Sequence, residues 1–383
     1  MVLMRTFEKH YIFVLSVCLL FVIGLTGAAS SNHQSAGSSR QAPVRLIYPN
    51  GLALDERGDL YISDTGTHRI LKLNQSGQLA VIAGTGEGGY SGDNGPAIKA
   101  QLNSPQDLAF DAEGNLFVAD SYNHRIRRID RQGVITTVAG TGNAPSRGYD
   151  TPAPKDSLNN PQGIAVDRAG NLLIADTYNR VVRRLDRNQT LSIIAGSVAG
   201  LAGDGGPATE AQLNLPMAVT TGPDGSVYVC DAANSRVRRI TADGKIQTVT
   251  GFGGGEGIGG AGFVGDSGPV EKAKLFTPVD LKFDNAGNLF ISDTGNNRIR
   301  VIRDKIITTF AGSGQAGFSG DGKPAIAAEL NTPQKIAIAK DGSIYIADRA
   351  NHRVRKIDAK GVITTVAGEG KPGGMNIDPD VNR

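Results

Sequence analysis

Short apolar runs alternate with polar turns along most of this chain, and the same arrangement returns six times. In the third copy, the runs fall within 161–167, 170–176, 182–185 and 191–196. Runs of this length, rich in Val, Ile, Leu, Phe, Tyr and Thr and bounded by Gly, Asn and Asp, predict β-strands joined by tight turns. Four runs in succession predict an antiparallel meander, whose strands we call a, b, c and d in chain order.

The copies are evenly spaced. The aspartate that closes strand b recurs at intervals of 56, 56, 55, 62 and 55 residues, and such a period indicates a repeat architecture. Strand a is nearly continuous in apolar and small residues, as in 163–166 and 335–338, which is typical of a strand covered on both faces. One unit cannot cover both of its faces, whereas six units can close into a ring. The sequence therefore predicts an all-β fold, a six-bladed β-propeller of four-stranded antiparallel blades.

The repeated phrase resembles the NHL-repeat family. The matching residues are P-x-G-[IL]-A-x-D, G-N-L-[YF]-[IV]-[AS]-D and N-x-R-[IV]-R, and they cover about residues 43–368. Four junctions between blades share G-D-x-G-P-A-x-x-A-x-L-x-x-P, which is similar to a bacterial, exported subgroup; they lie at 92–105, 203–216, 265–278 and 320–333. The resemblance implies the propeller fold, in a family known for its fold more than for one activity.

The N-terminus has the pattern of a secretory signal peptide. Arg5 and Lys9 precede an apolar run over 11–25, and small residues follow at 27–30. We predict a signal peptide over 1–30, cleaved after Ala29 or Ser30, and an exported protein that is periplasmic or secreted. The alternative is an uncleaved membrane anchor, although the apolar run is shorter than the ~20 residues that span a bilayer.

The remaining chain divides simply. A flexible linker over 31–42, the propeller over 43–368 and a disordered tail over 369–383 are predicted. After cleavage only Cys230 remains, so no intramolecular disulfide can form. The sequence leaves open whether the ring closes edge to edge or with 45–48 as an extra strand.

Composition excludes some classes of partner. The chain carries 40 basic and 37 acidic residues, interspersed along its length, for a net charge of +3. No long-range field would therefore attract phosphate or an anionic membrane. We expect no nucleic-acid partner, no membrane span in the mature form, and a monomer.

Topology places the long loops on one face. If strand a starts at one face, strand b returns to it, so the b–c turns and the long d–a connections share that face. We call it the upper face. Long loops on a rigid frame are where recognition usually occurs.

Charged residues that recur in every blade have a structural interpretation. The aspartate would accept backbone N–H groups in the b–c turn, the asparagine typified by Asn123 would take a left-handed position, and the arginine would pair within or between blades. In the junction motif, Asp93, Asp204, Asp266 and Asp321 are predicted to cap a short helical turn. The recurring aspartates and arginines are Asp64, Asp120, Asp176, Asp231, Asp293 and Asp348, with Arg69, Arg125, Arg236, Arg298 and Arg353.

Three histidines share one repeat position in blades that are contiguous around a closed ring. Equivalent positions in neighbouring blades are separated by about 10 Å, whereas zinc needs its nitrogen ligands at about 2 Å. His68, His124 and His352 are therefore not predicted to bind a metal. The sequence predicts no catalytic residue, no metal site and no cofactor.

Blade-specific residues gather where strand a begins, at the upper mouth of the central channel. Variation on a repeated frame is where specificity for one ligand could reside, and we predict an exported, noncatalytic scaffold that binds a protein, peptide or glycan there. The resemblance implies an alternative, because related six-bladed propellers include such enzymes: a metal-dependent lactonase-like or lyase-like enzyme with its site at the same mouth. The candidate ligand-binding residues are Asn50, Gln106, Asp107, Gln162, Met217, Asp280, Gln334 and Lys335.

Overall fold

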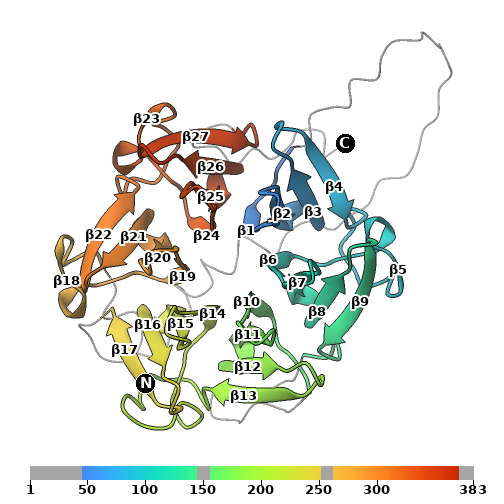
Figure 1. Ribbon diagram of the computed structural model, residues 1–383, viewed down its shortest axis with the longest axis horizontal. Coiled ribbons are helices and arrows are strands. Elements are labelled where there is room, and N and C mark those ends of the chain that lie inside the picture. The colour runs from blue at the N-terminus through green and yellow to red at the C-terminus, as the bar shows by residue number, and fades with distance from the viewer. Residues whose placement is uncertain (1–44, 145–155, 252–261, 371–383) are drawn as a thin grey trace, which may run out of the picture. The chain divides into compact units, whose positions relative to one another are not determined.

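Six antiparallel sheets are arranged in a ring in the computed structural model, with one strand of each sheet facing the centre (Figure 1). The structure describes residues 45–144, 156–251 and 262–370, which lie within one compact unit, 44–374. The all-β six-bladed propeller predicted from the sequence is confirmed. The signal peptide and the linker, like most of the tail, fall outside the described residues. Within the described residues, no helix is a candidate for crossing a membrane.

The first three blades follow the predicted meander, and a three-residue 3₁₀ helix forms each b–c turn. Their elements are β1 (Pro49–Leu54), β2 (Leu60–Asp64), η2 (Thr65–Thr67), β3 (Arg69–Leu73) and β4 (Leu79–Ala83); β5 (Gly95–Pro96), η3 (Ala97–Lys99), β6 (Pro105–Phe110), β7 (Leu116–Asp120), η4 (Ser121–Asn123), β8 (Arg125–Ile129) and β9 (Val134–Ala139); and β10 (Pro161–Val166), β11 (Leu172–Asp176), η5 (Thr177–Asn179), β12 (Val181–Leu185) and β13 (Leu191–Ala195).

The last three blades repeat the arrangement. Their elements are β14 (Pro216–Thr221), β15 (Val227–Asp231), η6 (Ala232–Asn234), β16 (Arg236–Ile240) and β17 (Ile246–Thr250); β18 (Gly268–Pro269), η8 (Val270–Lys272), β19 (Pro278–Phe283), β20 (Leu289–Asp293), η9 (Thr294–Asn296), β21 (Arg298–Arg303) and β22 (Ile306–Ala311); and β23 (Lys323–Pro324), η10 (Ala325–Ala327), β24 (Pro333–Ile338), β25 (Ile344–Asp348), η11 (Arg349–Asn351), β26 (Arg353–Ile357) and β27 (Val362–Ala367).

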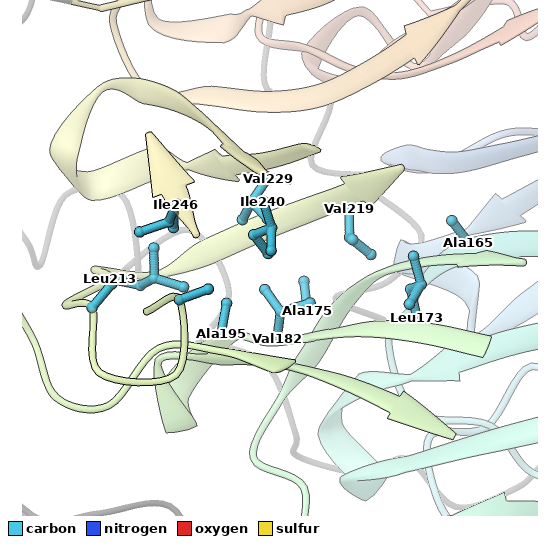
Figure 2. Close-up of a cluster of buried hydrophobic side chains, with 12 residues drawn as sticks. Ala165, Leu173, Ala175, Val182, Ala195, Leu213, Val219, Val229, Ile240 and Ile246 are labelled. Atoms are coloured by element: carbon cyan, nitrogen blue, oxygen red, sulfur yellow. The ribbon is translucent and has the colours of Figure 1, made fainter. Parts of the chain in front are cut away.

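The hydrophobic core lies between blades. Figure 2 shows one cluster, in which Leu173 and Val182 of blade three meet Val219 and Val229 of blade four. The innermost strands contribute because each is covered on both faces: Ile164 in β10 is fully buried. Each buried aliphatic side chain contributes about 1.5–3 kcal/mol. A blade is therefore stable only when both neighbours cover it.

The ring closes by packing of faces. Among the described strands, none is shared between the first and last blades, whose sheets run β1-β2-β3-β4 and β23-β27-β26-β25-β24, and residues 45–48 form no extra strand. We call the interface between blades six and one the seam. Leu52 and Ile62 pack there against Ala347 and Val354.

The d–a connections clamp the outer strands of adjacent blades. In the connection before blade two, Gly84 at the end of blade one donates its N–H to Ala97, while Pro96 pairs with Val134 at the start of β9. The short strands β5, β18 and β23 therefore lie at the outer rim (Figure 1). We expected the long connections to lie on the upper face. This expectation is wrong for the segments that form β5, β18 and β23, because these pair with the outermost strands of their blades.

Candidate functional site

The aspartate that ends strand b anchors the start of the same blade. The Oδ1 atom of Asp120 accepts the N–H of Asn103 at 2.7 Å, and its Oδ2 accepts the amide of Asn123 at 2.8 Å. The same N–H to Oδ1 bond is formed in all six blades. All six aspartates are buried, so these carboxylates have no access to an outside ligand.

A buried arginine that the sequence interpretation missed neutralises most of these carboxylates. Arg127 is fully buried, with its guanidinium 3.3 Å from Asp120 and 2.7 Å from Asp93. The predicted capping role of Asp93, Asp266 and Asp321 is wrong: proline takes the N-cap position, and each carboxylate pairs with the buried guanidinium. Asp204 pairs with Arg238 in the same way, in a connection that forms no 3₁₀ helix over 203–212. An uncompensated buried charge is far costlier than an open helix end. The equivalent arginines are Arg183, Arg238, Arg300 and Arg355.

The arginines that the sequence singled out bind the connections instead. Arg125 donates to the carbonyl of Thr141 at 2.7 Å, and its guanidinium lies 3.7 Å from the centroid of the Tyr90 ring. Phe263 and Phe318 cover the corresponding arginines of blades five and six at 3.9 Å. These aromatic rings hold the connection against its blade.

Blade one departs from this pattern. Leu71 occupies the position of the buried arginine, and Thr67 replaces the asparagine that bonds the aspartate. Burial raises the pKa of Asp64 to about 7, compared with about 6 for Asp120, which has a guanidinium beside it. Asp64 is therefore the turn aspartate whose charge is least compensated.

Replacing Asp64 with asparagine should remove a pH-dependent loss of stability. The folded protein keeps the Asp64 proton up to about pH 7, whereas the unfolded chain releases it near pH 4, so wild-type stability falls as pH rises through this window. Asp64→Asn should gain roughly 2–3 kcal/mol relative to wild type between pH 5 and pH 8. Urea unfolding at both pH values measures this, and parallel pH profiles for the two proteins would contradict the assignment.

Adjacent blades are joined by the residue that follows each 3₁₀ turn. His124 has a φ of 53°, and its Nδ1 accepts the N–H of Asn160 in the next blade at 3.1 Å. His68 and His352 make the same bond to Ser104 and Tyr48. The left-handed position predicted for Asn123 is wrong by one residue, because the asparagine ends the 3₁₀ turn and the left-handed residue follows it.

These three imidazoles are neutral. Burial lowers the pKa of each one, and the N–H bond to Nδ1 puts the remaining proton on Nε2. Each histidine therefore serves the junction between two blades. Among the described residues, no group of three or more His, Cys, Asp or Glu side chains could hold a metal ion.

Two carboxylates and one ammonium group from the innermost strands meet at the centre of the ring. Lys335 of blade six places its Nζ 3.4 Å from Asp107 of blade two and 3.5 Å from Asp280 of blade five, and these three side chains are almost fully buried. Nζ also donates to the carbonyl of Met217 in blade four at 3.0 Å. We call Asp107, Asp280 and Lys335 the channel triad. Together with the N–H of Ile164 in blade three, which Asp107 accepts, its contacts connect five of the six blades.

The channel triad is satisfied internally. Asp107 and Asp280 also accept the N–H groups of Ile164 and Ile336, at 3.0 and 2.7 Å. Burial opposes the charge on Lys335, but the two carboxylates outweigh it and raise the lysine pKa, so the ammonium form persists. A protonated lysine cannot act as a nucleophile, and its carboxylate partners are occupied.

The remaining candidates lie one residue earlier on the innermost strands. Asn50 donates from Nδ2 to Oε1 of Gln106 across the junction of blades one and two, and Asn50 Oδ1 is buried without a hydrogen-bond partner among the described residues. Gln162, Met217 and Gln334 are partly exposed. The structure thus buries five of the eight candidates in contacts with other protein groups and leaves the other three partly exposed.

Family comparisons agree with the repeat. The model of the teneurin NHL domain matches residues 52–148 and 314–375, and the NHL repeat model matches 158–181. NHL repeat-containing protein 2 of Bos taurus is 28% identical over 361 residues, covering 82% of this chain and 47% of the relative. Teneurin-1 of Mus musculus is 31% identical, covering 68% of this chain and 10% of that protein. The chain thus spans about half the length of NHL repeat-containing protein 2.

Solved structures share the fold at low identity. They include a streptogramin B lyase (TM-score 0.52, 14% identity, 86% of this chain and 85% of that one). An auxiliary nutrient binding protein from Bacteroides thetaiotaomicron is also similar (0.58, 17%, 84% and 70%), as is a gluconolactonase from Xanthomonas campestris (0.50, 16%, 79% and 83%). Likeness at this level shows the fold alone. With its six blades and repeated motifs, this chain belongs to the NHL-repeat family and forms a six-bladed β-propeller.

Proposed function

We propose that this protein is a noncatalytic binding scaffold that acts outside the cytoplasm and presents its upper face to a protein, peptide or glycan. The observation that carries the proposal is the contrast in exposure between the repeated charged residues and three residues at the start of the innermost strands. The repeated aspartates and their arginine partners are buried in contacts within the blades. Gln162, Met217 and Gln334, at the start of the innermost strands, stay partly exposed.

The channel triad supports binding over catalysis. A general base or a nucleophile needs a free carboxylate or amine within reach of substrate. Asp107 and Asp280 instead accept backbone N–H groups and face the ammonium of Lys335. Amides and a thioether at the mouth can hydrogen-bond to and pack against a ligand without transforming it.

Affinity capture with matched variants tests the proposal. An upper-face variant would carry Gln162→Ala, Gln334→Ala and a change of Tyr122, an exposed side chain of the b–c turn η4, to alanine. A control variant would carry Gln75→Ala and Arg131→Ala in the hairpins of the opposite face. We expect a ligand held by the parent and the control but bound at least about tenfold more weakly by the upper-face variant. Equal retention by both variants, or turnover in a screen of lactones and esters, would contradict the proposal.

Export from the cytoplasm leads to a separate prediction about the N-terminus of the mature chain. The charged, apolar and small-residue segments at the N-terminus support removal of a signal peptide on export. Intact-mass analysis of protein recovered from an envelope or medium fraction should give a mature chain that begins at Ser30 or Ser31. A chain that retains residues 1–30 and fractionates with membranes would favour the anchored alternative.

A further inference from the structure

The seam differs in composition from the other junctions on the upper face. At the start of the 3₁₀ turn, four blades carry a hydroxyl that donates to the proline carbonyl of the next blade, as Thr65 does to Pro105 at 2.7 Å. Blade six carries Arg349 at this position, and its guanidinium lies 5.2 Å from the centroid of the Tyr48 ring in blade one. Tyr48 in turn contacts His352, with ring centroids 4.5 Å apart.

Arg349 has unused hydrogen-bonding capacity. Its Nε is buried without a hydrogen-bond partner, and the Tyr48 ring is the contact that its guanidinium makes among the described residues. The arginine side chain is partly exposed. By contrast, Arg353 donates to the carbonyls of Gly368 and Gly370 and stacks on Phe318.

The charge around Arg349 is positive. Arg45, Arg349 and Arg353 all act on His352 and add to the effect of burial in lowering its pKa. Among the described residues, Asp348 pairs with Arg355, while Asp321 and Glu369 act on Arg353. The seam therefore presents a guanidinium, the edge of a positive cluster and a neutral imidazole on one part of the upper face.

This geometry suits a carboxylate carried by a peptide. A guanidinium can grip a carboxylate through two parallel N–H bonds, and the Nε2–H of His352 supplies a further donor. Arginine and tyrosine side by side are typical of the residues that dominate protein–protein binding energy. The other blades lack this combination: the equivalents of Arg349 are Thr65, Ser121, Thr177, Ala232 and Thr294.

We propose that the seam residues Arg349, Tyr48 and His352 form a docking site for an acidic peptide segment of a partner protein, with Arg349 gripping a carboxylate side chain. The proposal rests on the binding function proposed above and names the chemistry of its partner. It places recognition over the interface that closes the ring, so a bound partner would also bridge blades one and six.

The test uses a labelled hexaglutamate peptide, with hexaglutamine as its uncharged counterpart and polygalacturonate as an acidic glycan. Arg349→Thr restores the residue type of blades one, three and five, which carry threonine in folded turns, so the variant should remain folded. Arg349→Lys keeps the charge but loses the two-pronged geometry. Arg187→Thr removes one positive charge from an exposed hairpin on the opposite face and is the control for net charge.

Fluorescence anisotropy at low salt should show that the parent prefers hexaglutamate to hexaglutamine. Arg349→Thr should weaken hexaglutamate binding by about tenfold, Arg349→Lys by less, and Arg187→Thr by under twofold. Equal losses in the Thr variants at positions 349 and 187, or no preference over hexaglutamine, would overturn the site. If polygalacturonate binds more tightly than hexaglutamate and this binding depends on Arg349, the proposed peptide ligand is wrong and the site binds an acidic glycan. If the upper face still captures a ligand but hexaglutamate does not bind, the acidic-peptide site is wrong and the proposed binding function stands.

Discussion

Replacing Lys335 with methionine should destabilise the propeller by about 3–5 kcal/mol, because it leaves Asp107 and Asp280 buried without their common cation. Methionine has a similar length and no charge, so the loss should arise from electrostatics and from the hydrogen bonds to Met217 and Val279. Chemical denaturation at pH 7 measures the change in the free energy of unfolding.

A triple variant separates charge from packing. When Asp107→Asn and Asp280→Asn accompany Lys335→Met, the asparagine oxygens can still accept the N–H groups of Ile164 and Ile336. Most of the lost stability should then return, since no uncompensated charge remains. A single Lys335→Met variant as stable as wild type would show that the channel triad does not hold the blades together.

Removal of one blade should abolish soluble folding. Deletion of 161–215 joins Asn160 to Pro216. Asn160 has a left-handed φ, as does Leu215, the residue that precedes Pro216 in the parent chain, so the backbone conformation before the proline is kept. The cluster that includes Leu173 and Val219 would lose one of its two sides, and the six-fold closure would be broken. We expect aggregation, or a chain without a cooperative thermal transition.

A circular permutant is the matched control for this deletion. It would begin at Pro161 and join Gly370 to Arg45 through a short flexible linker. Tyr48 and His352 are in contact across the seam, so a short linker can make this connection. All six interfaces are kept, so the permutant should be soluble and unfold cooperatively. A deletion variant as soluble and heat-resistant as the permutant would refute the need for six blades.

The sequence was sufficient to predict the blades because their signals are local. The alternation of apolar runs with glycine turns specifies strands, and the unbroken apolar character of strands such as β10 indicates cover on both faces. Because each blade needs cover on both faces, six copies must close into a ring. The position of the upper face followed from counting strand directions alone.

The buried arginine was harder to identify. Arg125 and Arg127 lie two residues apart on the same face of β8, so periodicity could not say which one meets the aspartate. The choice depends on the preceding connection, which supplies Asp93 from 34 residues away and covers Arg127. The left-handed residue was misplaced for a similar reason, since the length of the 3₁₀ turn decides between Asn123 and His124.

The channel triad also required the closed ring. Lys335 contacts Met217, which lies 118 residues earlier in the chain, and no local pattern links those positions. The sequence could identify Asp107, Asp280 and Lys335 as blade-specific, but not that they neutralise one another. The contact between the seam residues Tyr48 and Arg349 could not be predicted either, because they come from the first and the last of the six repeats.

Hydrogen exchange of the wild-type protein distinguishes a ring that unfolds as one unit from a ring that opens at the seam, which none of the described strands crosses. We predict that the amides of β1 and β24, on either side of the seam, exchange only through global unfolding and are as protected as those of β10 and β14. Fast exchange confined to β1 and β24, at a free energy well below that of the other inner strands, would show that the ring opens at the seam and would contradict the account.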